Sequence, residues 1–120
     1  MTEESQNNKI FNRPWGIFEV IAAAKNHKVK KLTVYPKEKL SLQSHNFRSE
    51  HWVVVQGEAK VINGENEIRL SKNECTFIPS GSKHRLDNTG EENLEIIEVQ
   101  IGSYFEEDDI VRYDDLYNRV

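Results

Sequence analysis

The sequence is poor in the features that would tie a protein to an oxidising compartment or to a membrane. Its 120 residues include one cysteine, Cys75, and a lone cysteine cannot form an intramolecular disulfide. No segment combines a basic start with an apolar run long enough for a signal peptide or a membrane span. A chain of this length can still bury enough apolar surface to fold without metal or disulfide. We therefore expect a cytoplasmic protein with one core and no membrane partner.

The chain also lacks a basic surface for nucleic acid. Its net charge is −4, and residues 105–120 hold six acids against two arginines, which accounts for the whole excess. The rest of the chain is formally neutral. Binding to a phosphate backbone requires clustered lysine and arginine, so nucleic acid is not an expected partner.

The sequence does contain a series of short runs in which apolar and polar residues alternate between turn signals. Such period-2 runs predict β-strands, and no long stretch keeps apolar residues at helical spacing. The pattern is typical of a small all-β sandwich or barrel. The expected strands are at about residues 17–23, 28–35, 40–44, 51–56, 58–62, 66–70, 75–78, 84–87 and 94–102.

The two ends of the chain differ from its middle. Residues 1–10 are polar, and we expect a flexible N-terminal segment followed by a single domain at 11–120. Residues 105–120 are the one segment in which helical turns are expected. No internal repeat or low-complexity linker indicates a second domain.

Four side chains have the spacing of a metal site. Gln43 and His45 are two residues apart, so on a strand they point to the same face, and Glu50 opens the next strand. His84 follows a Pro-Ser-Gly turn that can start a strand with the imidazole facing inward. Taken singly, His84 reads as an ordinary hydrogen-bonded or surface histidine and Gln43 as ordinary strand polarity. His51 falls on the opposite strand face and is not an expected ligand.

The combined spacing resembles the two motifs of the cupin superfamily. Residues 45–57 match His-x4-Glu-x6-Gly, with Gln43 in place of the first histidine and Lys37 in place of the opening glycine. Residues 79–88 match Pro-x-Gly-x2-His-x3-Asn, with Asn73 in place of the first glycine. The resemblance implies an all-β cupin double-stranded β-helix, a jelly-roll barrel. The donor set favours a borderline divalent ion, zinc first, with cobalt, nickel, manganese or iron as alternatives.

Longer strings narrow the resemblance to one family. Residues 13–16 (RPWG), 41–52 (SLQSHNFRSEHW) and 98–104 (EVQIGSY) resemble the C-terminal cupin domain of type II mannose-6-phosphate isomerases. Those domains are usually fused to a GDP-mannose pyrophosphorylase, whose nucleotidyltransferase domain would need a few hundred further residues. The resemblance implies a stand-alone isomerase domain in GDP-mannose biosynthesis, which interconverts mannose 6-phosphate and fructose 6-phosphate through a cis-enediol.

The implied reaction needs a base that moves a proton between C1 and C2 of the sugar, with a pKa near neutrality. Lys83, Glu98 and Lys31 are the candidates, and Lys31 is also a candidate for substrate binding. Taken singly, each of the three fits a solvated surface charge better than a catalytic base.

The phosphate of the substrate needs cationic recognition, for which the guanidinium fork of arginine is well suited. The family resemblance points to a C-terminal arginine important for activity, and Arg112 is the candidate, with Arg119 second. Arg48 is expected either to bind phosphate or to orient Glu50. Arg85 is expected to face away from the site.

Other readings of the same residues stay open. The pocket could bind a sugar phosphate or a nucleotide sugar without catalysis, or belong to another cupin enzyme such as a dioxygenase or a phosphoglucose isomerase. Small barrels have strand edges to protect, so a homodimer is expected. A sugar phosphate is the expected small-molecule partner.

Overall fold

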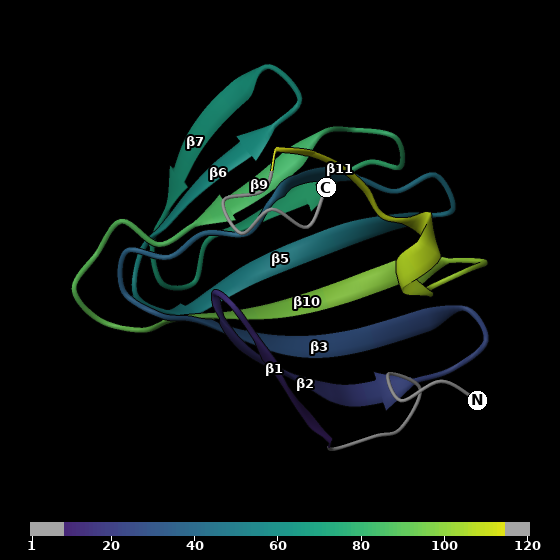
Figure 1. Cartoon of the computed structure of the whole chain (residues 1–120), viewed down its shortest axis with the longest axis horizontal. Coiled ribbons are helices and arrows are strands. Elements are labelled where there is room, and N and C mark those ends of the chain that lie inside the picture. Colours follow the sequence, from purple (N-terminus) through teal and green to yellow (C-terminus); the bar gives the residue numbers. More distant parts are fainter. Residues whose placement is uncertain (1–8, 115–120) are drawn as a thin grey trace.

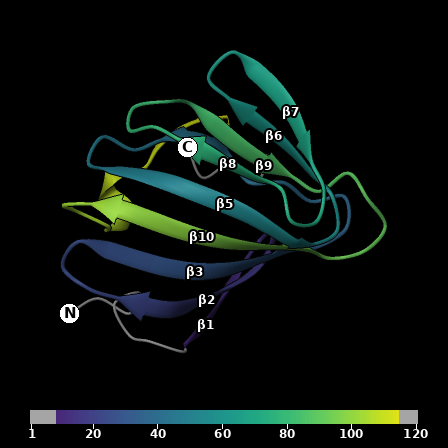
Figure 2. The ribbon, with the colours of Figure 1, turned by 180° about the vertical axis from the view of Figure 1, so that it is seen from behind.

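The protein folds into two antiparallel β-sheets that face each other (Figure 1). A computed structural model describes residues 9–114. The first sheet has the strand order β1 (Ile10–Arg13), β2 (Gly16–Ala23), β3 (His27–Val34), β10 (Leu94–Gly102), β5 (Arg48–Gln56) and β8 (Cys75–Ile78). The second has the order β11 (Val111–Asp114), β4 (Leu42–Ser44), β9 (His84–Asp87), β6 (Ala59–Asn63) and β7 (Asn66–Leu70). β8 is best seen from behind (Figure 2).

The all-β fold class and its two-sheet arrangement are confirmed, and each of the predicted strands is present. Two strands at the ends of the described chain were missed. β1 begins at Ile10, inside the segment predicted to be flexible, while residues 1–8 lie outside the described residues. β11 lies where helical turns were expected, and only the 3-10 turn Glu107–Asp109 matches that expectation. Both missed strands are short edge strands of their sheets, near the ends of the described chain.

The interior has an apolar half and a polar half, because the inward residues change character along three neighbouring strands. On β10 the inward side chains run from Leu94 and Ile96 to Glu98 and Gln100. The inward residues of β3 change from Leu32 to Lys30, and those of β5 change from Val54 to Glu50. Across the three strands, Ile96 is paired with Leu32 and Val54. Further along β10, Glu98 is paired with Lys30 and Gln100 is paired with Glu50. The hydrophobic core therefore fills one end of the sandwich and leaves a polar chamber at the other.

One glycine allows the strands to close around the polar half. Gly102 pairs with Arg48 at the end of β10, and a Cβ at Gly102 would lie 2.2 Å from the Phe47 carbonyl oxygen. Any side chain there would push β10 away from the start of β5.

Within residues 9–114 no helix is long and apolar enough to cross a bilayer.

Candidate metal centre and ligand cavity

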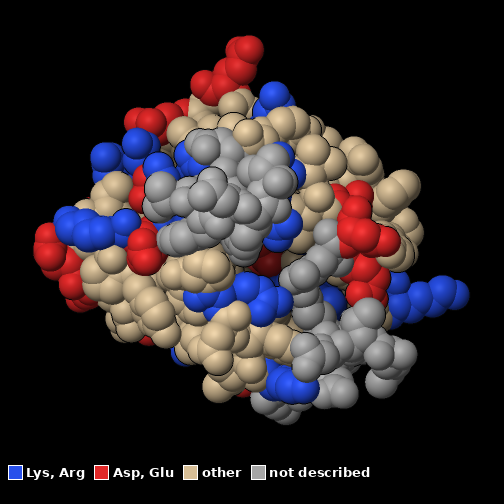
Figure 3. Space-filling model, in the orientation of Figure 1, with Lys and Arg blue, Asp and Glu red and all other residues tan. Residues whose placement is uncertain are grey.

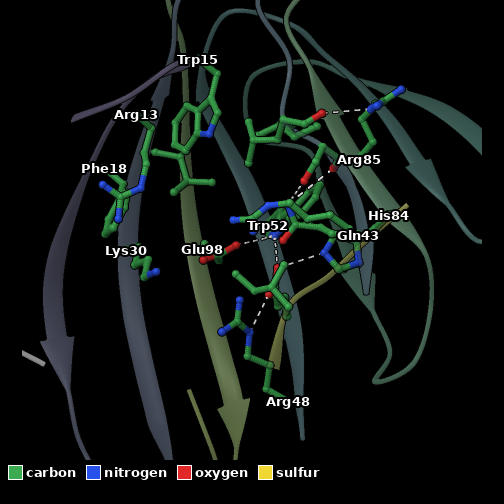
Figure 4. A pocket seen from close by; sticks show the side chains of 17 residues that line it. Arg13, Trp15, Phe18, Lys30, Gln43, Arg48, Trp52, His84, Arg85 and Glu98 are labelled. Carbon is green, nitrogen blue, oxygen red and sulfur yellow. Dashed lines mark hydrogen bonds and ion pairs between the residues drawn. The ribbon is translucent and has the colours of Figure 1, made fainter. Parts of the chain in front are cut away.

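The polar half of the interior encloses a cavity of about 610 Å³, measured with its opening to solvent. Residues of both sheets line it, and most are polar or charged (Figure 4). The site therefore combines burial with a high density of charge.

Three buried side chains converge on one side of this cavity. His45, Glu50 and His84 are each at most 3% exposed, and their candidate ligand atoms all lie within 4.8 Å of one another. The His45 Nε2 atom is 3.1 Å from Glu50 Oε2, and His84 Nε2 is 3.9 Å from Glu50 Oε1. Two imidazoles and a carboxylate at this spacing form a donor set that suits a divalent transition metal or zinc.

Local hydrogen bonding brings the two histidine-bearing segments together. β4 pairs with β9 so that Gln43 lies opposite His84. The Gly81 amide, at a φ of 83° that favours glycine, donates to the His45 carbonyl oxygen at 2.7 Å. The turn before β9 is thus fastened to the end of β4.

The His84 imidazole is poised as a neutral ligand. His84 Nδ1 lies 3.0 Å from the Ser82 carbonyl oxygen, which assigns the proton to Nδ1 and turns the Nε2 lone pair toward Glu50. Burial lowers the pKa of His84 despite the attraction of Glu50. His45 Nδ1 is buried with no hydrogen-bond partner among the described residues. The fit to a metal ion rests on the donor set, two imidazoles and one carboxylate whose ligand atoms lie within 4.8 Å of one another.

The carboxylate at the centre is held in its ionised form. Burial alone would raise the pKa of Glu50, but the hydrogen bond to His45 and the charge of Arg48 outweigh burial and lower the pKa well below its ordinary value. Arg48 Nε donates to Glu50 Oε2 at 2.9 Å, and Arg48 is itself only 5% exposed. Arg48 thus holds Glu50 in place by a hydrogen bond. Orienting Glu50 was one of the two roles expected for Arg48, and phosphate binding was the other.

Gln43 lines the same cavity and is half-buried. Its Nε2 atom donates to Ser41 Oγ at 3.0 Å, so the amide nitrogen serves as a hydrogen-bond donor and not as a metal ligand. The amide oxygen is the atom of Gln43 that could bind a cation.

A second buried carboxyl lies beside the three-residue cluster. The indole N–H of Trp52 is shared between Glu50 Oε1 at 2.9 Å and Glu98 Oε2 at 3.0 Å, and Gln100 Nε2 donates to Glu98 Oε1 at 2.7 Å. Burial, followed by the negative charge of Glu50, raises the pKa of Glu98 to about 8. Lys30 opposes that rise. Glu98 is therefore a carboxyl whose ionisation changes near neutral pH, which is the property required of a general acid or base.

Lysine and arginine are concentrated at this cavity although the protein is acidic overall. Its lining includes five cationic side chains and two carboxyls, and the cationic residues are Arg13, Lys30, Arg48, Arg85 and Arg112. Such side chains gather near the centre of the face in the space-filling view (Figure 3). The buried Nε atom of Arg112 has no hydrogen-bond partner within residues 9–114. Arg85 is among the lining residues, but it alternates with His84 on β9, and Figure 4 shows its guanidinium directed away from the cluster, where its Nε donates to the Leu40 carbonyl oxygen at 3.0 Å.

Some predicted site residues lie away from this cavity. Lys83 is exposed, with its ammonium nitrogen 4.2 Å from the centroid of the Tyr113 ring. Lys31 points to the outer face of its sheet and pairs with Glu95 at 2.7 Å, an interaction that raises the pKa of Lys31. Arg119 lies outside the described residues.

Three cavity residues were missed, and two had a signal in the sequence. Lys30 is two residues from Leu32 and in phase with it, so alternation alone assigns Lys30 to the inner face. Trp52 is in phase with Glu50 in the same way. Arg13 had no such signal, because β1 itself was not predicted.

Comparisons with known proteins agree with this architecture. Residues 1–115 match the family model described as "Mannose-6-phosphate isomerase C-terminal". The chain is 48% identical over 118 residues to the xanthan biosynthesis protein XanB of Xanthomonas campestris, covering 98% of this chain and 25% of that protein. It is 52% identical over 109 residues to the mannose-1-phosphate guanylyltransferase ManC of Salmonella typhimurium, covering 90% and 22%. The chain thus spans about a quarter of the length of these relatives.

Solved structures share the fold at low sequence identity. The capsular polysaccharide assembling protein CapF from Staphylococcus aureus superposes with a TM-score of 0.76 at 18% identity, covering 93% of this chain and 34% of that one. A double-stranded β-helix protein from Klebsiella pneumoniae gives a TM-score of 0.70 at 17% identity, covering 89% and 86%. These similarities show the cupin double-stranded β-helix fold.

Proposed function

Because the chain belongs to the mannose-6-phosphate isomerase C-terminal family of cupin domains, we propose that it interconverts mannose 6-phosphate and fructose 6-phosphate. One observation carries the proposal: the buried His45, Glu50 and His84 cluster adjoins a buried carboxyl, Glu98, whose pKa is raised toward neutrality. An aldose–ketose isomerisation needs both a polarised carbonyl and a proton carrier beside it.

The proposed metal ligands are Gln43, His45, Glu50 and His84. A divalent ion there, zinc as the first candidate, would supply Lewis-acid polarisation of the sugar oxygens at C1 and C2. The support is the donor set of His45, Glu50 and His84.

Glu98 is the proposed proton carrier. Its carboxylate removes the proton from C2 of the aldose while the C1 carbonyl oxygen gains a proton, which yields the cis-enediol. Return of the proton from Glu98 to C1, with loss of the O2 proton, forms the ketose and restores the starting carboxylate. Trp52 and Gln100 hold Glu98 in place by hydrogen bonds. Lys83 and Lys31 lie away from the cavity, so we do not propose either as the base.

Two arginines are proposed to support the metal ligands and the reacting end of the sugar. Arg48 keeps Glu50 ionised and oriented, since it donates to that carboxylate from a buried position. Arg112 lies opposite Gln43 on β11 and lines the cavity, so its guanidinium can stabilise negative charge on the enediol oxygens. The guanidinium of Arg112 contacts substrate in this proposal, whereas Arg48 acts through Glu50.

The test is conversion of mannose 6-phosphate to fructose 6-phosphate by the full chain after metal loading. We expect His45→Ala to remove turnover and Glu98→Gln to lower kcat by at least about 100-fold, in the range for loss of a general acid or base. Glu95→Gln is the matched control, because Glu95 faces outward on the same strand. Absence of metal-dependent turnover in the unmodified protein would exclude the isomerase. Binding of the sugar phosphate without turnover would then favour a non-catalytic binding domain.

We also propose that the protein is a homodimer. Both sheets end in edge strands, β1 and β8 in one sheet and β7 and β11 in the other. Pairing or covering of such edges is a common route to dimers. Sedimentation at the mass of one protomer would exclude this assembly.

A further inference from the structure

Two cationic side chains meet at one aromatic ring on the side of the cavity away from the metal-binding cluster. The Lys30 Nζ atom lies 4.3 Å from the centroid of the Phe18 ring, and the Arg13 guanidinium carbon lies 4.9 Å from it. Phe18 is only 4% exposed and stacks on Phe11 with ring centroids 4.9 Å apart. The ring therefore gives both cations a fixed, uncharged support. Figure 4 shows Arg13, Phe18 and Lys30 together, across the cavity from His84.

Strand order sets the separation between this pair and the metal-binding cluster. Glu50 lies on β5, and Glu98 lies on the neighbouring β10, directly paired with Lys30 on β3. Neighbouring strands are about 4.8 Å apart, so Lys30 lies roughly 10 Å across the sheet from β5. This is about the length of a six-carbon sugar phosphate from its C1–C2 end to its phosphorus. Glu98 is paired with Lys30 on one side and with Trp52 on the other, and Glu50 lies two residues before Trp52 on β5, so the metal-binding cluster, the buried carboxyl and the cation follow one another diagonally across the sheet.

The charge of the cavity fits an anion at this position. Its lining carries five cations and two carboxyls, which is an excess of positive charge. A phosphate monoester carries a charge of about −1.5 to −2 at pH 7. Lys30 is only 8% exposed, and a buried ammonium is stabilised by a nearby negative charge. Arginine adds a planar fork that matches phosphate oxygens.

We propose that Arg13 and Lys30 bind the phosphoryl group of the substrate, so that the sugar lies across β5, β10 and β3 with its reacting end at Glu50 and Glu98. The inference rests on the proposed function for the identity of the sugar, but not for the binding of phosphate itself. Arg13 comes from β1, the edge strand of its sheet. The N-terminal strand of the domain therefore completes the binding site and selects phosphorylated over neutral sugars.

The first experiment uses inorganic phosphate and the metal-free full chain, because chelation prevents phosphate from binding a metal ion. Calorimetry is expected to show saturable binding, which Arg13→Ala and Lys30→Met each weaken by about 10- to 100-fold, as expected for charged hydrogen bonds. Arg13→Lys is expected to retain part of the affinity. Lys60→Met is the matched control, since Lys60 pairs with Glu67 on the opposite sheet. Circular dichroism identifies any variant that fails to fold.

The second experiment measures kinetics with mannose 6-phosphate. Arg13→Ala is expected to raise KM by about 10-fold or more with kcat nearly unchanged, because the lost contact is remote from the reacting carbons. Phosphate binding that is lost in Arg85→Gln or Arg112→Gln but kept in Arg13→Ala and Lys30→Met would overturn the inference. So would the absence of phosphate binding in the unmodified protein. Phosphate binding that depends on Arg13 and Lys30 in a protein without turnover would uphold the inference and exclude the isomerase.

Discussion

The apolar and polar halves of the interior are equally buried, yet they are built from opposite kinds of side chain. Ile96 and Leu94 on β10 have 0% exposure, and so does Gln100 further along the same strand. Apolar burial stabilises the fold, whereas burial of charged groups costs free energy even when they are paired. The polar half therefore contributes less to stability than the apolar half, and we attribute its charged residues to the proposed binding and chemistry. Changes in the two halves should have separable effects.

The largest expected effect on binding comes from the centre of the polar half. Glu50→Gln removes the one carboxylate of the cluster, and we expect the affinity for Zn²⁺ to fall by well over 100-fold, more than for loss of a supporting group. Calorimetric titration of the metal-free chain measures the change. Glu95→Gln, which faces outward, should leave the affinity unchanged. Equal zinc affinity of Glu50→Gln and the unmodified chain would remove Glu50 from the ligand set.

The apolar half should show the reverse behaviour. Ile96→Ala creates a cavity among fully buried neighbours, so we expect the free energy of unfolding to fall by about 2–5 kcal/mol. Urea denaturation measures this loss, and zinc affinity in the folded state should stay close to that of the unmodified chain. Ile101→Ala is the control, because Ile101 is 49% exposed. A large loss of zinc affinity in Ile96→Ala would show that the halves are not separable.

The boundary between the halves should respond to pH in the metal-free protein. The pKa of Glu98 is raised to about 8, so the folded state holds a proton that the unfolded state releases above about pH 4.3. Stability from this proton is present below the unfolded pKa and is lost as pH rises toward 8, by roughly 2 kcal/mol or more. Glu98→Gln should flatten this decline, as urea denaturation between pH 5 and 8 can show.

Glu50 contributes to the pH dependence in the opposite sense, because its pKa is lowered in the folded state. The stability that Glu50 provides is present above its unfolded pKa and is lost as pH falls below it. His84 acts in the same sense as Glu50, because its lowered pKa removes stability as pH falls below its unfolded value. The contribution of Glu98 is therefore read from the difference between the unmodified chain and Glu98→Gln, and an identical pH dependence of the two between pH 5 and 8 would contradict the raised pKa of Glu98.

A smaller effect is expected from the segment that supports the cluster from outside. Both carboxylate oxygens of Asp109 accept backbone amides, from Asn46 and Phe47 at 3.0 Å each, directly after His45. Asp109→Ala should loosen this loop and weaken zinc binding by about 10-fold, as for other groups that position ligands. Asp108→Ala is the neighbouring control, since Asp108 accepts a hydrogen bond from Tyr104 instead.

The smallest expected effect separates two adjacent lysines. Lys31→Met removes a charge that is paired with Glu95 on the outer face, so we expect KM for mannose 6-phosphate to stay within about twofold, as for an exposed ion pair. Lys30→Met, one residue away, should raise KM. Steady-state kinetics on the two variants tests whether the inner face alone binds substrate.

Much of the fold could be predicted because the strands in the middle of the chain alternate clearly between turns. The three-residue cluster was also foreseeable, since the spacing of His45, Glu50 and His84 is a property of sequence. β1 and β11 were missed because they are edge strands in the terminal segments, and their positions depend on pairing with β2 and β4. Tertiary contacts therefore determine that these two segments form strands.

The details of the chemistry depended on packing that no single segment reveals. The raised pKa of Glu98 comes from burial and from Glu50, a residue on another strand. The inward position of Lys30 was visible in the alternation, but choosing it required knowing that charged residues occupy this part of the interior. Sequence therefore identified the cluster better than the cavity around it.

The hydrogen bond from the Gly81 amide to the His45 carbonyl oxygen also bears on how the protein folds. It joins two segments that are distant in the chain, and β4 and β9 must pair before the two histidines can approach each other. Contacts of this kind form only after the entropic cost of closing a long loop has been met. A metal ion would therefore bind the finished fold rather than nucleate it, and would slow unfolding more than it speeds folding.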